Sequence, residues 1–394
     1  MASSDYYIQD NADIESQKTE AAKSLYQAGD YKGALRLYTD MLNSNYSYKL
    51  CYEIGRCYYK LDDLDNAETY FARSISMEGY KNPSYLYMGN IYFKKQEISK
   101  AIENWITAYS YKPDDESVCL NLASSYFSKN MKFYSIYFYG KYLKYAKDKT
   151  SSHYLEIKNT LDEFYNIGNN FYKKAVQAMS MNDNETACQA LEYAVVNFPT
   201  NFDINNLLGK IYYDEKKYSQ ARTYLEQAFC LDPKSIDILK RLSSVMIYTG
   251  DITGAYCCLK RMLPLVLSRQ KDYYEIIKTT KDLETRFHDS DIEKHIVLAD
   301  KYYAENNYYL ALFEYENSIL LNNALAEKYD NIVQKIKLFF NPEERIIKTC
   351  MEKGALFHSA GDFIKSNKYF SKVMTLSDDS SSAYKIAKSR IVNV

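Results

Sequence analysis

The stretch that decides the fold is "YMGNIYFKKQEISKAIENWITAYSYKPDD", residues 87–115. Gly89 and Tyr92 stand three residues apart, and Ala101 and Trp105 stand four apart. Because residues three or four apart share one face of an α-helix, each small residue lies beside its aromatic partner. The stretch therefore predicts two amphipathic helices joined by a short turn.

The same spacing recurs along the chain of 394 residues. Small residues in the first helix form the series Ala22, Gly55, Gly89, Ala123, Ala175, Gly209, Ser243, Ala299 and Gly354. Small residues in the second helix form the series Ala34, Ala67, Ala101, Ser135, Ala187, Ala221, Ala255, Ala311 and Ser366. Both series have successive gaps of 33, 34, 34, 52, 34, 34, 56 and 55 residues. Since even the irregular gaps are shared, the chain is predicted to contain about nine stacked copies of one helix pair.

Close helix contact explains the residue types at these positions. Gly89 and Ala101 are expected to let the two helices of a pair approach each other, and Tyr92 and Trp105 to fill the gaps between neighbouring pairs. Turns between paired helices are expected where the sequence reads "AGDY", "TGDI" and "AGDF". Three second helices are expected to end at Pro113, Pro199 and Pro233.

These residues resemble the tetratricopeptide repeat family, with small–x–x–Tyr in the first helix, then Ala, an aromatic residue and Ala in the second, then Pro. "NPSYLYMGNIYFKKQEISKAIENWITAYSYKPDD" from Asn82 and "NFDINNLLGKIYYDEKKYSQARTYLEQAFCLDPK" from Asn201 are the best matches. The resemblance covers residues 14–380 and departs from the family at Ser135, Ser243, Ser366 and Ala178. It implies an all-α fold, an α-solenoid in which antiparallel helix pairs stack into a right-handed superhelix.

The three long gaps predict three inserted or lengthened helices, at 150–167, 270–291 and 326–346. They change either the course of the solenoid or its contacts with a partner or second copy, and both readings stay open. The insertions leave repeats 1–4, repeats 5–7, repeat 8 and repeat 9 at 14–149, 168–269, 292–325 and 347–380. The ends are expected to be a flexible segment over 1–13 and a capping helix over 381–394.

Charge and composition exclude several classes of function. The 50 basic and 51 acidic residues give a formal net charge of -1, so the chain lacks the basic field that nucleic acid attracts. No stretch of eighteen apolar residues occurs and the start has no signal-peptide core, so no membrane insertion is predicted. The 8 Cys show no paired framework, which favours a reducing compartment and predicts a cytoplasmic protein.

Motifs that carry chemistry are missing from the sequence. It contains no C-x-x-C, H-E-x-x-H, G-x-S-x-G or glycine-rich phosphate loop. The cysteines are therefore interpreted as core thiols and the histidines as packing or surface residues. We predict no catalytic residues, no metal site and no cofactor, and hence no enzyme.

The family resemblance implies that first helices line a concave groove. Aromatic residues on that face are either ordinary repeat packing or a stripe that binds an extended peptide or helix. The predicted partner-binding groove consists of Tyr26, Arg56, Tyr59, Asn90, Phe93, Asn121, Phe127, Lys173, Lys210, Tyr213, Lys240, Arg241 and Tyr303. Asn90 and Asn121 match two positions with which some family members hold a chaperone C-terminal carboxylate, but Leu86 stands where that clamp has Lys.

The sequence thus predicts a non-enzymatic protein–protein interaction scaffold that binds a peptide or helical segment of a partner. Two alternatives stay open, a helical-repeat RNA-binding protein and a regulatory subunit of an enzyme complex. A homo-oligomer is also open.

Overall fold

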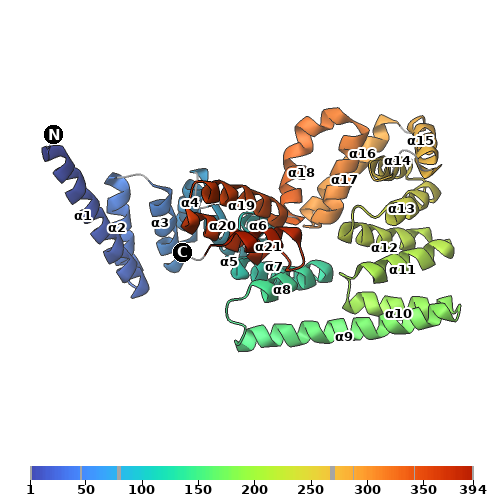
Figure 1. The fold of residues 1–394 in the computed structure, drawn as a ribbon, viewed down its shortest axis with the longest axis horizontal. Helices are drawn as coiled ribbons and strands as arrows, with labels where there is room; N and C mark the ends of the chain where they lie inside the picture. Colours follow the sequence, from blue (N-terminus) through green and yellow to red (C-terminus); the bar gives the residue numbers. More distant parts are fainter. Residues whose placement is uncertain are drawn as a thin grey trace. The chain divides into compact units, whose positions relative to one another are not determined.

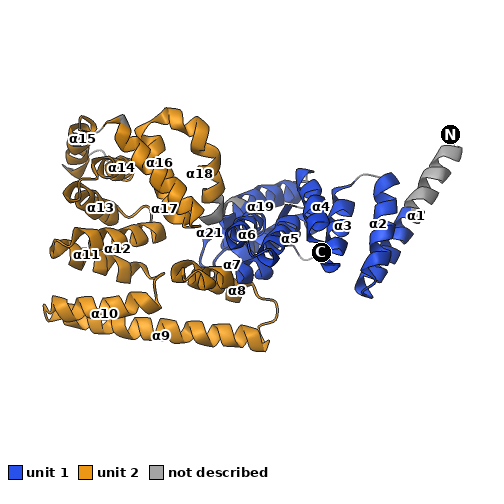
Figure 2. Ribbon diagram, turned by 180° about the vertical axis from the view of Figure 1, so that it is seen from behind, with its two compact units in different colours: residues 1–122, 338–394 blue, residues 123–337 orange. Residues whose placement is uncertain are grey.

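The computed structural model describes residues 2–44, 47–77, 81–266, 271–286, 288–340 and 342–392, with the backbone alone at 2–14, 271, 289, 338–340, 344 and 345. Within these ranges the chain is helical from α1 to α21 and contains no strand (Figure 1). The predicted all-α solenoid class is therefore confirmed. Two compact units divide the chain, unit 1 with residues 1–122 and 338–394 and unit 2 with residues 123–337 (Figure 2).

Unit 1 contains the first repeats and the last one. Its helices are α1 (Ala2–Gln27), α2 (Tyr31–Ser44), α3 (Tyr48–Lys60), α4 (Leu64–Ser76), α5 (Lys81–Lys94), α6 (Ile98–Tyr111), the start of α7 (Glu116–Ser128), α19 (Pro342–Ser359), α20 (Phe363–Leu376) and α21 (Ser382–Arg390). Helix α1 begins at Ala2, and the flexibility predicted for residues 1–13 stays a prediction. No Gly or Pro interrupts α1, and the helix continues because nothing in the sequence breaks it.

Unit 2 contains the middle repeats. Its helices are α8 (Lys132–Tyr145), α9 (Ser152–Ser180), α10 (Asn184–Asn197), α11 (Phe202–Asp214), α12 (Tyr218–Leu231), α13 (Ile236–Tyr248), α14 (Ile252–Met262), α15 (Lys271–Glu284), α16 (Asp289–Ala304), α17 (Tyr308–Leu321), the 3-10 turn η1 (Asn323–Leu325) and most of α18 (Ala326–Phe340). The segment predicted at 150–167 is the first half of α9, one continuous helix of 29 residues. Separate helices, α15 and α18, occupy the other two long gaps.

Each helix pair closes through a turn with one residue in the left-handed region. These residues are Gly29, Asp62, Gln96, Asn130, Asn182, Lys216, Gly250, Asn306 and Gly361. Aspartates that follow such residues cap the second helix: Asp63 accepts from the Asn66 N–H at 3.2 Å and Asp251 from the Gly254 N–H at 2.9 Å. One such turn for each predicted repeat explains why the "GD" pattern recurs.

Glycines in the first helices hold bulky residues of the second helix in the same pair. A Cβ on Gly89 would lie 2.4 Å from Trp105, and a Cβ on Gly209 would lie 2.7 Å from Leu225. Trp105 thus fills the space over Gly89 inside its own pair, which corrects its predicted place between pairs. Tyr92 does reach the preceding pair, where its hydroxyl donates to Glu68 Oε1 at 2.6 Å.

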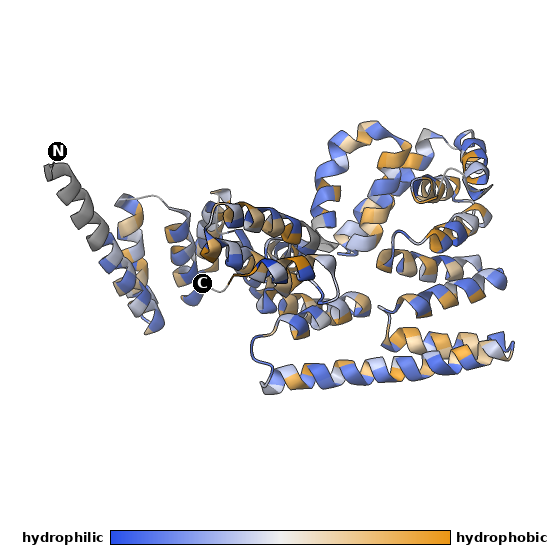
Figure 3. Ribbon diagram, viewed as in Figure 1, coloured by the Kyte–Doolittle hydropathy of each residue, from blue (hydrophilic) through white to orange (hydrophobic). Residues whose placement is uncertain are grey.

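Apolar and polar residues alternate around the helices (Figure 3). The apolar faces meet in a core that continues from repeat to repeat, and one cluster of buried residues extends through unit 2 from Ala175 to Phe313. Trp105 and Phe71 are almost fully buried in unit 1. The core is therefore built by the stacking of neighbouring pairs, because a single helix pair cannot bury its apolar face alone.

Each unit also has contacts between repeats that are far apart in sequence. In unit 1, repeat 9 packs on α6, where the Tyr109 hydroxyl donates to Glu343 Oε1 at 3.2 Å and Lys372 pairs with Asp114. In unit 2, the turn before α8 meets the turn before α17, where Lys129 Nζ donates to Asn306 Oδ1 at 2.6 Å. In a simple solenoid each repeat contacts only its neighbours in sequence. The contacts between distant repeats within each unit are additional to that pattern.

Candidate functional site

In unit 1, six residues of the predicted groove lie on four successive first helices. Tyr26 is on α1, Arg56 and Tyr59 on α3, Asn90 and Phe93 on α5, and Asn121 on α7. We call these six residues the first-helix surface of unit 1. They extend over repeats 1 to 4, as a surface for an extended partner requires.

Arg56 joins the first two helices of this surface. Its guanidinium carbon lies 4.3 Å from the Tyr26 ring centroid, within cation–π range, and its Nη1 donates to Glu53 Oε2 at 2.7 Å. Burial raises the pKa of Tyr26 to about 12, although the Arg56 charge opposes the rise. Glu53 thus holds Arg56 in place and balances its charge. Arg56 therefore contributes the flat, half-buried face of its guanidinium to the surface and not a free positive charge.

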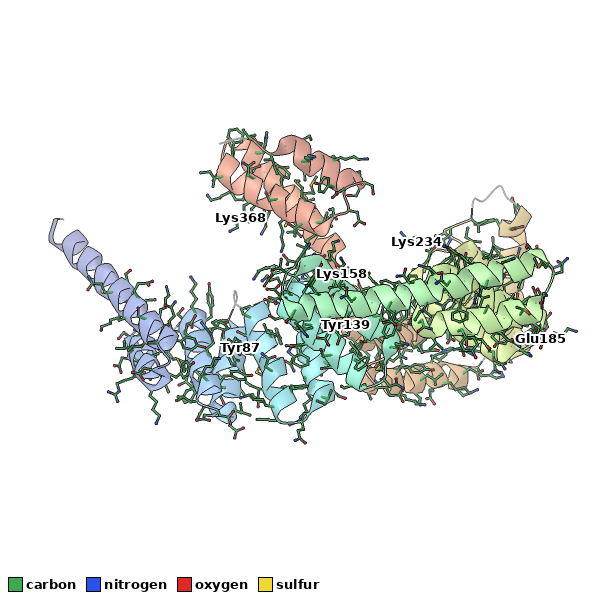
Figure 4. The ribbon with its side chains drawn as sticks, turned by 90° about the horizontal axis from the view of Figure 1, so that it is seen from below. Tyr87, Tyr139, Lys158, Glu185, Lys234 and Lys368 are labelled. Atoms are coloured by element: carbon green, nitrogen blue, oxygen red, sulfur yellow. The ribbon has the colours of Figure 1, made fainter. Side chains whose placement is uncertain are left out.

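Tyr59 continues the surface through a residue that the sequence did not single out. The Tyr87 ring packs edge-on against Tyr59 at 5.3 Å and stacks on Phe71 at 4.9 Å (Figure 4). Lys94 lies over the other side, with its Nζ 4.6 Å from the Tyr59 centroid and 2.7 Å from Asp62 Oδ1. Tyr87 stands two residues before Gly89. It is therefore not among the positions three or four residues after a small residue of the series.

Asn90 and Asn121 contact each other in the structure. Asn121 Nδ2 donates to Asn90 Oδ1 at 3.0 Å, and Trp105 Nε1 donates to the same oxygen at 3.0 Å. Both lone pairs of that oxygen are therefore used within the protein. A carboxylate would be held by amide N–H groups, so these hydrogen bonds orient the two amides and do not bear on the clamp.

Phe93 presents the largest apolar area on this surface. Its side chain is 51% exposed, and its ring lies 5.7 Å from that of Trp105. A half-exposed ring supported from beneath by a buried indole loses little entropy when a partner covers it. Around Phe93 the surface is aromatic and its charges are paired, which suits an apolar side chain of a peptide.

The other predicted groove residues belong to unit 2. Phe127 on α7 is 64% exposed and lines a cavity of about 260 Å³ together with Tyr139 of α8 and Ile157 and Leu161 of α9. Tyr139 and Lys158 mark this part of the molecule in Figure 4. The lengthened half of α9 thus lies beside the first-helix face of repeat 4.

Tyr213 belongs to a cluster of tyrosines on repeats 6 and 7. The Tyr213 ring lies 6.0 Å from Tyr218, which stacks on Tyr248 at 4.5 Å, and Tyr248 is 61% exposed. Lys210, on the same helix α11, is exposed. Sequence spacing missed Tyr218 and Tyr248 because these residues stand next to the turns and not at the positions set by the small-residue series.

The remaining predicted residues lie on separate helices of unit 2. Arg241 of α13 donates to Asn206 Oδ1 at 2.9 Å, and Lys240 lies 3.8 Å from Asp272. Tyr303 of α16 packs edge-on against Tyr308 at 5.3 Å, and Lys173 is exposed on α9. Arg241 thus connects the first helices of repeats 6 and 7, as Arg56 connects those of repeats 1 and 2.

Metal sites and reactive thiols are the other chemistry that the described ranges could offer. No group of three or more His, Cys, Asp or Glu there could hold a metal ion. All eight thiols are free, and seven of them are buried, which agrees with their interpretation as core residues. No helix in those ranges is both long and apolar enough to cross a bilayer.

The tetratricopeptide repeat family matches this sequence at residues 19–80 and again at residues 202–235. Together with the helix pairs and their turns, these matches show that the chain contains tetratricopeptide repeats.

Two curated relatives are similar in sequence. BBSome complex member BBS4 of Bos taurus is 24% identical over 245 residues, which cover 60% of this chain and 42% of the relative. The protein of the same name from Mus musculus is 23% identical over 108 residues, 27% of this chain and 21% of the relative. The chain thus matches less than half the length of either relative.

Solved structures of the same repeat class are also similar. The TPR2AB-domain:pHSP90-complex of yeast Sti1 matches with 12% identity and a TM-score of 0.28, covering 69% of this chain and 99% of that chain. YrrB, described as a TPR protein with an unusual peptide-binding site, matches with 15% identity and a TM-score of 0.25, covering 54% and 97%. Likenesses at this level bear on neither the partner nor the function of this chain.

Proposed function

We propose that this protein is a non-enzymatic interaction scaffold that binds a peptide or helical segment of a partner protein on the first-helix surface of unit 1. One observation carries the proposal: groove residues chosen from sequence spacing form contacts across successive first helices, with Phe93 half exposed among them. Aromatic residues backed by a packed core are typical anchors for a bound chain.

Charge supports a neutral, apolar recognition segment. Arg56 is paired with Glu53, and Lys94 with Asp62, so the surface offers little net field to attract a polyanion. The net charge of -1 for the whole chain likewise speaks against a nucleic acid partner. We therefore expect a partner segment with one or two large apolar side chains.

Assembly into a larger complex is part of the proposal. The relatives from Bos taurus and Mus musculus are named as members of a complex. By analogy, this chain acts as one subunit of a multi-protein assembly in the cytoplasm, and contact with a second copy of itself is one form that the assembly can take. Native extracts of the source should then contain the protein in particles much larger than the 46.0 kDa chain.

Site-specific photo-crosslinking tests the surface. A benzoylphenylalanine replaces Phe93 on the first helix α5, and in a matched variant it replaces Ile364 on the second helix α20, which is 73% exposed. Both positions are apolar and in unit 1, and Ile364 is the more exposed. After irradiation in an extract of the source, crosslinked proteins are identified by mass spectrometry.

The expected result is a defined partner attached at position 93 and absent at position 364. Addition of the crosslinked partner peptide in excess should suppress the product. The proposal fails if both positions give the same set of proteins, or if position 364 alone captures a defined partner.

A further inference from the structure

Unit 2 contains another cavity, lined mainly by residues of its second helices and of the turns before them. An outer cavity of about 460 Å³ and an inner cavity of about 130 Å³ adjoin each other. They share the lining residues Phe133, Tyr134, Thr223, Gln227 and Asn307. Helices α8 and α12, which can be followed in Figure 2, contribute the first four of these residues, and Asn307 precedes α17. The outer cavity serves as a vestibule for the inner one.

Aromatic rings form one wall. Tyr309 meets Phe133 edge-on at 5.5 Å and stacks on Tyr134 at 5.6 Å. The Tyr134 hydroxyl donates to Asn307 Oδ1 at 2.7 Å and accepts the Tyr309 N–H at 3.1 Å. Two hydrogen bonds thus hold the Tyr134 hydroxyl in place before any ligand enters. Tyr126 also stacks on Tyr134, at 4.8 Å, so Phe133 and Tyr309 are the rings of this wall whose faces can attract a cation.

The inner cavity ends at a carboxyl group. Glu226 lines it but not the vestibule, and its side chain is only 14% exposed. Glu226 Oε1 accepts from Arg222 Nε at 2.6 Å, and no other hydrogen bond to this carboxyl occurs among the residues that the structure describes. One oxygen of Glu226 is thus left for a ligand.

Acidic groups outnumber basic ones around this point. Arg222 is shared among Glu226, Asp251 at 2.8 Å and Glu314 at 3.9 Å. His295, buried behind them, contacts Glu314 Oε2 at 2.5 Å and Thr253 at 2.8 Å. Three carboxyl groups therefore share one guanidinium and one imidazole beside the inner cavity, and the cation Lys132 lines only the outer one.

We propose that the inner cavity binds an alkyl guanidinium or ammonium group, presented by an Arg or Lys side chain of a partner protein, with the cation between the aromatic wall and Glu226. A cation there forms a charge-assisted hydrogen bond with the remaining oxygen and balances the acidic excess. The side-chain methylenes pack against Phe133 and Tyr309 in the vestibule.

Size and electrostatics agree with this ligand. An apolar protein cavity of about 150 Å³ holds benzene, so about 130 Å³ accommodates a planar guanidinium with part of its alkyl chain. Burial raises the pKa of Glu226 to about 7, because nearby groups stabilise its charge only in part. A neutral ligand would leave the free-energy cost of burying the Glu226 carboxylate in place, and an anion would increase that cost. This site belongs to unit 2 and does not depend on the function proposed for unit 1.

Small cations test the site on the full chain. Arginine amide, spermidine and the capped pentapeptide Ala-Ala-Arg-Ala-Ala are titrated at pH 8 by ligand-observed NMR, with citrulline amide as the neutral isostere of arginine amide. Fragments of this size are expected to bind in the millimolar range. Two variants remove the site by different means: Glu226→Gln removes the charge, and Thr223→Phe fills the space that both cavities share.

A matched control replaces an exposed acid elsewhere in unit 2. Glu185→Gln makes the same chemical change in the first turn of α10 (Figure 4). Arginine amide should bind wild type and Glu185→Gln equally, and Glu226→Gln at least about tenfold more weakly. Thr223→Phe should abolish binding, and circular dichroism shows whether it remains folded.

The outcomes separate the sources of the cation. Binding of the pentapeptide assigns the site to a protein side chain, whereas binding of spermidine without the pentapeptide assigns the same chemistry to a free polyamine. The proposal is overturned if citrulline amide binds as well as arginine amide, if Glu226→Gln retains full affinity, or if no cation binds at 20 mM or so, where this fragment class is detectable.

Discussion

Replacing Gly89 by alanine tests how the repeats pack. An added Cβ would lie 2.4 Å from Trp105 Cδ1 and Nε1, whereas ordinary contact begins at 3.4 Å, so the indole must move by 1 Å. Trp105 is 2% exposed and donates from Nε1 to Leu86 O at 3.2 Å and to Asn90 Oδ1 at 3.0 Å. The shift therefore strains the core and breaks hydrogen bonds at once.

The expected cost can be worked out from these contacts. Overpacking a core costs about 1–3 kcal/mol, and a lost hydrogen bond about 1 kcal/mol. Alanine offsets about 1 kcal/mol of this because it favours the helix more than glycine does. Gly89→Ala should thus destabilise the protein by about 1–3 kcal/mol.

Gly140→Ala is the matched control. Gly140 lies within α8, and a Cβ there would meet no atom within 4 Å. Only the higher helix propensity of alanine over glycine remains, so this variant should be more stable than wild type by about 0.5–1 kcal/mol. The same substitution is therefore expected to have opposite signs at the two sites.

Fluorescence makes the assay local. Trp105 is the single tryptophan of the chain, so its emission during urea unfolding reports on repeat 3 alone, while circular dichroism follows all helices. Gly89→Ala should lower the fluorescence midpoint and shift the native emission to the red. If Gly89→Ala raised stability as Gly140→Ala does, with unchanged emission, the packing of Trp105 on Gly89 would be refuted.

Three more predictions concern buried charge and distant contacts. Burial raises the pKa of Glu226 from 4.5 to about 7, so between these values the unfolded state ionises first and wild-type stability falls as pH rises. Glu226→Gln should remove this fall, so the variant should be more stable than wild type by up to about 3 kcal/mol at pH 8. Urea titrations at several pH values measure this, and a difference in unfolding free energy that does not change with pH would contradict it. His295→Ala should cost about 3 kcal/mol in thermal unfolding, because it removes the closest partner of Glu314, which is 2% exposed and then keeps Asn317 at 3.5 Å and Arg222 at 3.9 Å; His295→Gln should cost less. Removing residues 338–394 should lower the urea midpoint at Trp105, because it uncovers Tyr109 on α6, and an unchanged midpoint would mean that repeat 9 does not support repeat 3.

Part of the candidate site could be read from the sequence. Spacing from Gly55 and Gly89 led to Arg56, Tyr59, Asn90 and Phe93, because a helix has a fixed period and brings such residues to one face. Tyr87 was missed since it contributes from the side of its helix, through the stack on Phe71. Contacts of that kind depend on how adjacent pairs are rotated, which spacing within one helix does not specify.

Local structure was fixed by the sequence itself. The number of helix pairs, their turns and the contact of Gly89 with the second helix of its pair follow from periodicity and turn chemistry, which act within about 34 residues. The tertiary structure alone decided the long-range contacts, such as Tyr109 with Glu343 and Lys129 with Asn306, and with the latter the cavity above Glu226. Small rotations at each repeat interface add up along a solenoid, so residues that meet across many repeats depend on that sum and not on any local pattern.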